Sequence, residues 1–98
     1  MKLKVYLSGP QNENNTHETE MIFNIAEKAI RNMNLEPVNP LKLDTIGVSW
    51  EEDRKACIRA LLDCHLILML PGWEESDNAN LEHKVANSLN INQLKIQL

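Results

Sequence analysis

Glu82 is the side chain in this sequence best placed to do chemistry. It follows an apolar run, residues 66–70, and a polar turn, residues 74–80, and it lies one turn into the helix that we expect next. A side chain at that position leans back toward the loop, so its carboxylate is partly desolvated and close to the ends of strands. Such a carboxylate can act as a nucleophile or base at a sugar carbon. The alternative is a first-turn glutamate that only stabilises the helix dipole, where acidic residues are common.

Other polar side chains can serve the same site. Tyr6 ends a predicted strand, so its hydroxyl can orient the carboxylate, although a strand tyrosine more often packs with its tip in water. Ser76 stands where the loop becomes the helix, where it can donate to a phosphate or simply cap the helix. Asp53 lies on one face of the preceding predicted helix, where it can enter the site or favour the helix dipole.

The tryptophan and cysteine side chains can be explained by packing alone, without a role in binding or catalysis. Trp50 and Trp73 can stack on a base, but half-buried packing against the protein is the favoured interpretation of both. Cys57 has no basic neighbour in the sequence that would lower its pKa, so we interpret it as a packing residue. We place Cys57 and Cys64 on one helix, roughly two turns apart, where they cannot form a disulfide. The cysteines and histidines show no paired ligand spacing, so we expect no metal site.

Apolar periodicity predicts the first elements of the chain. Residues 2–8 alternate and indicate a strand that ends at the breaker cluster Ser8-Gly9-Pro10. One face of this strand is assigned Leu3, Val5 and Leu7, and the other Lys2, Lys4 and Tyr6. That cluster is neither a dinucleotide fingerprint nor a P-loop, because the required glycines are absent. After a polar loop, residues 11–18, we expect an amphipathic helix from about Glu18. Its apolar stripe is assigned to Met21, Ile22, Ile25, Ala26, Ala29, Ile30 and Met33.

The rest of the chain continues the alternation of strands and helices. Residues 35–38 indicate a second strand, and Ser49 to Glu52 have the spacing of a capping box that starts a second helix. Residues 66–70 are a buried strand that Pro71-Gly72 stops. The third helix is expected to carry Leu81, Val85, Ala86 and Leu89 on its packed side. The tail, residues 93–98, alternates as a last strand with Leu94, Ile96 and Leu98 on one face.

Strands that alternate with helical crossovers predict parallel strands with helices on both faces. We expect an α/β fold, a doubly wound three-layer sandwich of four mainly parallel strands in the order 2-1-3-4 with three helices. The switch point then lies between the first and third strands. Ser8-Gly9-Pro10 and Pro71-Gly72-Trp73 should meet there and form a ligand crevice.

Composition narrows the classes of function. The 98 residues are 43% hydrophobic and 24% charged, which predicts one globular domain over residues 1–98. The net charge of −4 and the lack of a basic run argue against nucleic-acid binding. No membrane-length apolar stretch and no signal pattern are present, so we expect no membrane association and a cytoplasmic location.

Three segments of the chain resemble one known superfamily. VYLSGP ends the first predicted strand, VNP follows the second, and IRALLDCHLILMLPGWEESDNANLEHKVA spans the third strand and its flanking helices. Together they resemble the nucleoside 2-deoxyribosyltransferase-like superfamily, in particular its small, often phage- or prophage-borne members of unknown function. The resemblance covers nearly the whole chain and implies a Rossmann-like fold. Relatives include nucleoside 2-deoxyribosyltransferases and 2'-deoxynucleoside 5'-monophosphate N-glycosidases.

The resemblance implies cleavage or transfer of the N-glycosidic bond of a (deoxy)nucleoside or nucleoside 5'-monophosphate. Glu82 matches the glutamate that attacks the anomeric carbon, and Tyr6 matches the tyrosine that orients it. Cys57 stands where the enzymes carry an aspartate, and Asp53, one turn away, is the candidate to replace it. Substrate or phosphate binding is assigned to Ser8, Gly9, Pro10, Trp73, Ser76 and Asn78, the last of which stands where the enzymes have a glycine.

Three functions are compatible with these residues. The first is an N-glycosidase or deoxyribosyltransferase, which Ser76, Glu82 and Tyr6 favour. The second is a nucleotide-binding or sensing domain without turnover, which Cys57 and Asn78 favour. The third is a structural protein with an empty pocket. No cofactor is expected, because attack by a carboxylate needs none. A homodimer or higher symmetric oligomer is expected, because the relatives complete a shallow crevice with a neighbouring subunit.

Overall fold

A computed structural model describes residues 2–11, 14–45 and 47–97 of the chain, and strands alternate with helices along it. The strands are β1 (Lys4–Ser8), β2 (Glu36–Val38), β3 (Leu66–Met69) and β4 (Asn92–Gln93). The α-helices are α1 (Thr16–Asn32), α2 (Trp50–Leu62) and α3 (Asp77–Ser88). Short 3₁₀ turns, η1 (Pro40–Lys42) and η2 (Trp73–Glu75), follow β2 and β3.

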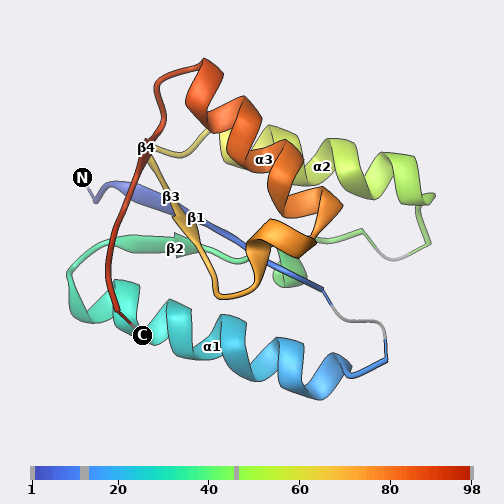
Figure 1. Cartoon of the computed structure of the whole chain (residues 1–98), viewed down its shortest axis with the longest axis horizontal. Coiled ribbons are helices and arrows are strands. Elements are labelled where there is room, and N and C mark those ends of the chain that lie inside the picture. Colours follow the sequence, from blue (N-terminus) through green and yellow to red (C-terminus); the bar gives the residue numbers. More distant parts are fainter. Residues whose placement is uncertain (1, 12–13, 46, 98) are drawn as a thin grey trace.

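The sheet has the predicted topology. Its strand order is β2-β1-β3-β4, and each neighbouring pair is parallel. Helix α1 covers one face, while α2 and α3 cover the other (Figure 1). The α/β doubly wound sandwich predicted from the sequence is therefore confirmed. Because Ser8 lies opposite Met69, β1 and β3 end at the same edge of the sheet.

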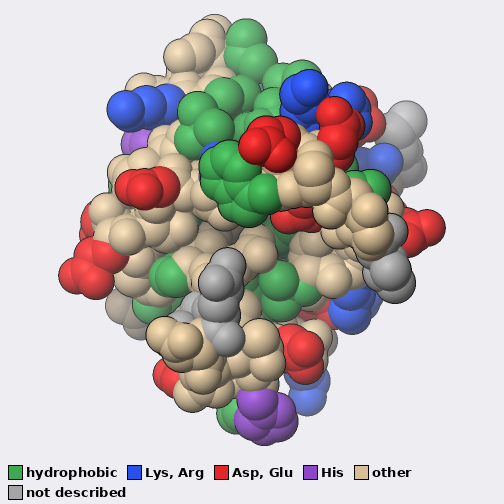
Figure 2. All heavy atoms as spheres, turned by 90° about the vertical axis from the view of Figure 1, so that its right-hand side faces the viewer, with side chains coloured by type: hydrophobic (Ala, Val, Ile, Leu, Met, Phe, Trp, Pro, Cys, Tyr) green, Lys and Arg blue, Asp and Glu red, His purple; other side chains and the backbone are tan. Residues whose placement is uncertain are grey.

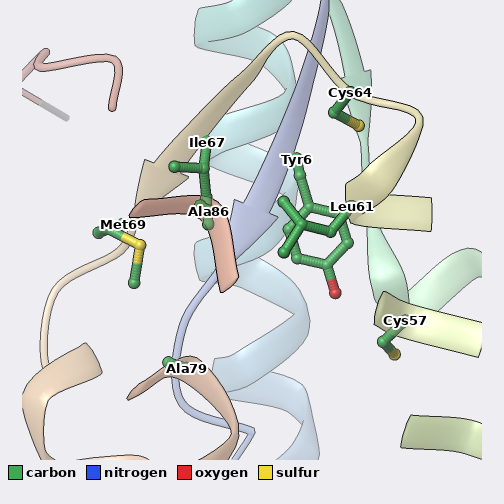
Figure 3. Close-up of a cluster of buried hydrophobic side chains, with 8 residues drawn as sticks. All are labelled: Tyr6, Cys57, Leu61, Cys64, Ile67, Met69, Ala79 and Ala86. Carbon is green, nitrogen blue, oxygen red and sulfur yellow. The ribbon is translucent and has the colours of Figure 1, made fainter. Parts of the chain in front are cut away.

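Each face of the sheet carries its own hydrophobic core, as strand alternation requires. Val5 and Leu7 of β1 face α1, whereas Tyr6 faces α2 and α3. The α1 side is completed by Phe23, Ala26, Ile30, Leu68 and Leu70. The α2 and α3 side contains Tyr6, Cys57, Leu61, Cys64, Ile67, Met69, Ala79 and Ala86 (Figure 3).

The packed face of α1 differs from the predicted stripe. The side chains of Met21, Ile25 and Met33 are 51%, 53% and 44% exposed, so assigning them to the core was wrong. Phe23, which the prediction left out, is 1% exposed and belongs to the packed face. The buried set is Thr19, Phe23, Ala26, Glu27 and Ile30. The packed face of α1 is therefore rotated about the helix axis relative to the predicted stripe: it takes in Thr19, Phe23 and Glu27 and leaves the opposite edge of the stripe in solvent.

Helix α3 begins earlier, and packs on a different side, than the sequence pattern indicated. Residues 77–80, predicted as a polar turn, form its first turn, and Ser76 is its N-cap. Its buried residues are Ala79, Glu82 and Ala86, whereas Leu81 and Leu89 are 43% and 56% exposed. The predicted apolar side was therefore wrong for Leu81 and Leu89, whereas Ala86 and the partly buried Val85 do pack against the core. A buried glutamate needs hydrogen-bonding partners from other parts of the fold, and the spacing of apolar residues in one helix does not predict such partners.

Two smaller predictions also need correction. Cys64 follows α2, which ends at Leu62, so the two cysteines do not share a helix, and both are free. The last strand is limited to Asn92–Gln93; Leu94 and Ile96 are half-buried against the α1-side core, and Leu98 lies outside the described residues. The N-terminal loop is shorter than predicted because Asn15 caps α1, accepting a hydrogen bond from the Glu18 amide.

Candidate active site

The carboxylate of Glu82 is held by two hydroxyl groups from the central strand. Tyr6 Oη donates to Glu82 Oε2 at 2.7 Å, and Ser8 Oγ donates to Oε1 at 2.6 Å. Tyr6 and Ser8 are two residues apart on β1, so both side chains point to the α3 side of the sheet. Glu82 faces them from α3 and is only 5% exposed. The fold thus places one carboxylate, with each oxygen in a defined position, near the carboxyl ends of the central strands.

Burial dominates the electrostatics of this carboxylate. Desolvation raises the pKa of Glu82 above its ordinary value, and the hydrogen bonds from Ser8 and Tyr6 and the charge of Arg54 oppose that rise without cancelling it. Burial, reinforced by the negative charge of Glu82, also raises the pKa of Tyr6 far above its usual range. Tyr6 therefore stays protonated and acts only as a donor toward Glu82.

Cys57 on α2 lies next to Tyr6, on the same side of the sheet as Glu82. Its side chain is 5% exposed, and its thiol lies close to Tyr6, whose hydroxyl is on the Cys57 side of the core (Figure 3). Burial raises the pKa of the Cys57 thiol to about 11, so the thiol is neutral at ordinary pH. Its position in the apolar core agrees with the packing role predicted from the sequence.

The beginning of α3 carries the residues predicted to hold a phosphate. Ser76 Oγ accepts a hydrogen bond from the Ala79 amide at 3.2 Å, as an N-cap does. This bond uses an oxygen lone pair, so the hydroxyl proton of Ser76 remains able to donate elsewhere. Asn78 accepts a hydrogen bond from Arg54 through its side-chain oxygen. The Arg54 guanidinium also lies over the Trp50 ring, 5.2 Å from its centroid.

The two turns predicted to meet at the switch point do lie together. A Cβ added to Gly9 would be 2.7 Å from Leu70 Cβ, and one added to Gly72 would be 3.3 Å from Pro10 Cγ. Only glycine allows the end of β1 to approach so closely. Gly72 also has a φ of +84°, which allows the chain to reverse after β3.

Not every predicted site residue has the contact expected of it. Ser8, predicted to bind substrate, donates to the Glu82 carboxylate. Asp53 is half-buried on α2, and its negative charge adds to the effect of burial in raising the pKa of Cys57. Trp73 is half-buried, as expected, and one face of its ring stacks on His83 with the centroids 4.7 Å apart. Trp50 is 64% exposed, so the half-buried position favoured for it was wrong.

Arg54 is a member of the site that the sequence pattern did not single out. It acts on Glu82 by its charge and bonds to Asn78 at the beginning of α3. One signal was visible in the sequence, because Arg54 lies four residues after Trp50 and so stands on the same side of α2. Its link to Asn78 crosses from one helix to another, and a local pattern carries no information about such a contact.

The edge of the molecule that carries these residues faces the viewer in Figure 2. Strand β1 runs toward this edge, and α1, α2 and α3 begin there (Figure 1). Hydrophobic side chains gather in the upper half of the view, over α2 and α3 (Figure 2).

Among the described residues, no group of three or more His, Cys, Asp or Glu side chains is arranged to hold a metal ion. In the same part of the chain, no helix is both long and apolar enough to span a membrane.

Comparisons with known proteins agree with this architecture. Residues 3–95 match the family described as "Domain of unknown function (DUF4406)". The fold is similar to that of the 2-desoxiribosyltransferase from Leishmania mexicana, with a TM-score of 0.71 and 19% sequence identity. The similarity covers 94% of this chain and 62% of that protein, so the chain spans less than two thirds of its neighbour's length. No curated protein matches the sequence. At this identity the likeness shows the fold alone.

Proposed function

The chain belongs to the DUF4406 family, and from its fold and its buried carboxylate we propose that it cleaves or transfers the N-glycosidic bond of a nucleoside or nucleoside 5'-monophosphate. The observation that carries this proposal is the Glu82 carboxylate, which is 5% exposed and bonded to the neutral hydroxyls of Tyr6 and Ser8. Burying a carboxylate among neutral partners costs folding free energy. The structural neighbour, a 2-desoxiribosyltransferase, supports glycosyl transfer as the use for such a group.

In the proposed reaction, one oxygen of Glu82 attacks the anomeric carbon of the sugar. The carbon–nitrogen bond breaks, its electron pair leaves with the base, and the base takes up a proton. The product is an ester between Glu82 and the sugar, which water or a second base then resolves at the same carbon. Tyr6 holds the carboxylate by its hydrogen bond at 2.7 Å and, because its own pKa is raised, does not compete as an anion.

A second candidate function is nucleotide binding without turnover. Cys57 presents a neutral thiol next to Tyr6, and its pKa of about 11 prevents it from supplying a negative charge. The side chain of Asn78 is bonded to Arg54 at the beginning of α3. Cys57 and Asn78 stand where the enzymes that the chain resembles carry an aspartate and a glycine. Both differences favour a domain that binds a nucleotide and leaves it intact.

An assay of base release separates the two candidates. The protein is incubated with ribo- and deoxyribonucleosides and with their 5'-monophosphates, and free base is measured by chromatography. The enzyme proposal expects release from at least one compound. Binding by calorimetry with no base released from any compound would favour the non-catalytic alternative.

Ser76 is expected to determine preference for a phosphorylated substrate. Replacing it with alanine removes the hydroxyl donor at the beginning of α3, so the affinity for a 5'-monophosphate should fall roughly fivefold to tenfold relative to the nucleoside. The lost N-cap should also lower the free energy of unfolding by about 1 kcal/mol. Ser76→Asp is the matched control, since aspartate caps well but repels phosphate. If Ser76→Asp binds the monophosphate as tightly as the wild type, the phosphate does not lie at this position.

The outer side of α3 supports a homo-oligomer. Leu81 and Leu89 lie on this side and are 43% and 56% exposed, and Val85, halfway between them in the sequence, is partly buried against the core. We expect a symmetric dimer or higher oligomer by light scattering, and Leu89→Glu should shift it toward monomer. The control is Ile25→Glu, which changes a residue 53% exposed on α1, across the sheet. A wild-type monomer at working concentration would contradict this assignment.

A further inference from the structure

We propose that Ser8 is a positioning residue that fixes the plane of the Glu82 carboxylate, so that an oxygen is always held in the same place and direction relative to the substrate. The inference rests on the proposed function, because it assigns Ser8 a part in the reaction of Glu82. It replaces the substrate-binding role expected for Ser8 from the sequence.

The geometry of the two donors is the first observation behind this role. Tyr6 and Ser8 donate to different oxygens of Glu82, at 2.7 Å and 2.6 Å. A carboxylate with one donor can turn about its last carbon–carbon bond and still keep that hydrogen bond. With a second donor on the other oxygen, any turn except a half-turn, which only exchanges the two equivalent oxygens, breaks at least one bond. Ser8 therefore adds orientation that Tyr6 alone does not provide.

The backbone of Ser8 is itself held in place. Ser8 lies opposite Met69 in the sheet, and its carbonyl accepts a hydrogen bond from the Leu70 amide at 2.7 Å. Its side chain is 0% exposed, so bulk water does not reach the hydroxyl as a competing partner. A short side chain on a fixed backbone is a more rigid donor than a long one, because it has fewer rotatable bonds.

The charged and titratable groups around Glu82 come from two elements. Tyr6 faces it from β1, and Arg54 and Cys57 act on it or on its partner Tyr6 from α2. Tyr6 and Cys57 are neutral at ordinary pH, and Arg54 remains positively charged. Loss of the Ser8 donor should therefore appear in the titration of Glu82 itself.

The test compares Ser8→Ala with Ser8→Cys. Cysteine keeps approximately the size of serine but is a weak donor, so a packing role predicts that Ser8→Cys resembles the wild type. The positioning role predicts that both variants lose about tenfold in kcat and that the acid limb of the rate profile moves to higher pH. Unchanged kcat and pH profile in Ser8→Ala, with Glu82→Gln inactive, would overturn the role of Ser8 alone.

A second measurement does not depend on turnover. The carboxyl carbon of Glu82 is titrated by NMR in the wild type and in Ser8→Ala, with Glu82→Gln identifying the signal. The proposal expects a higher pKa for Glu82 in Ser8→Ala, because a donor to the charged form is lost. An identical Glu82 titration in both proteins would overturn the proposal. Failure of the wild type to release any base would instead count against the proposed function.

Discussion

Glu82→Gln is expected to reduce base release roughly a thousandfold or more while leaving the protein at least as stable as the wild type. Glutamine has nearly the same shape but cannot form the ester to the sugar. Removing a buried negative charge also removes its desolvation cost. One of the two hydroxyls, of Tyr6 or Ser8, can rotate to accept from the new amide nitrogen while the other still donates to the amide oxygen. Kinetic assay and denaturant unfolding of the same preparations measure the two effects.

The pKa of Glu82 determines how this difference in stability changes with pH. Burial raises the folded-state pKa of Glu82 above the ordinary value of 4.5, so the folded protein favours the protonated, uncharged side chain. The stabilising contribution of this protonated form is fully present below pH 4.5. It is lost as pH rises through the raised pKa. Glu82→Gln should therefore gain stability relative to the wild type between acid and neutral pH. At Glu27 burial raises the pKa, but the hydrogen bonds and charges of Lys42, Asn39 and Arg31 together outweigh it and lower the pKa. Only the difference between the two proteins therefore isolates Glu82.

Glu75→Gln is the matched control for both effects, because Glu75 is an exposed carboxylate in η2. It should leave activity and stability near wild-type values, within about 0.5 kcal/mol for the free energy of unfolding. An active Glu82→Gln protein, or a strongly destabilised one, would contradict the role assigned to Glu82.

Gly9→Ala is expected to destabilise the fold by about 3 kcal/mol, a large part of the stability of a small domain. The added Cβ would lie 2.7 Å from Leu70 Cβ, which is anchored to the backbone and cannot swing away. The ends of β1 and β3 would have to separate, moving Ser8 away from Glu82. Chemical denaturation measures the loss.

Gly47→Ala provides the comparison. Gly47 has a φ of +80° with no atom within 4 Å of an added Cβ, so alanine there meets backbone strain but no steric clash. It should cost about 1 kcal/mol, clearly less than Gly9→Ala. Equal effects of the two substitutions would show that the close approach of Gly9 to Leu70 does not limit stability.

The sheet order could be predicted because parallel strands with helical crossovers allow few arrangements. The alternation of Val5, Tyr6 and Leu7 also assigned the two faces of β1 correctly. The packed sides of α1 and α3 could not be predicted in the same way. In each helix a buried glutamate interrupts the apolar pattern: Glu27 pairs with Lys42 at 2.7 Å, and Glu82 bonds to β1.

The candidate site was predictable in part. Tyr6 was identified by its residue type and its place in the first strand, and Glu82 by its place after the third strand; the structure joins them by a hydrogen bond. The side of the sheet to which Ser8 points follows from the two-residue period of a strand, but its partner was hidden because the packed side of α3 had been misassigned. The link from Arg54 to Asn78 crosses between helices and depends on how α2 and α3 pack.

Mass spectrometry of the peptide that contains Glu82 measures whether this carboxylate forms a bond to the sugar. The protein is incubated with 2'-deoxy-2'-fluoroarabinonucleosides and their 5'-monophosphates, whose fluorine slows both steps at the anomeric carbon so that a glycosyl-enzyme ester accumulates. We expect the mass of the fluorinated sugar, with or without its phosphate, on Glu82 in the wild type and no adduct in Glu82→Gln. An adduct on another residue, or base release from the same analogues without any adduct, would contradict the role of Glu82 as the nucleophile.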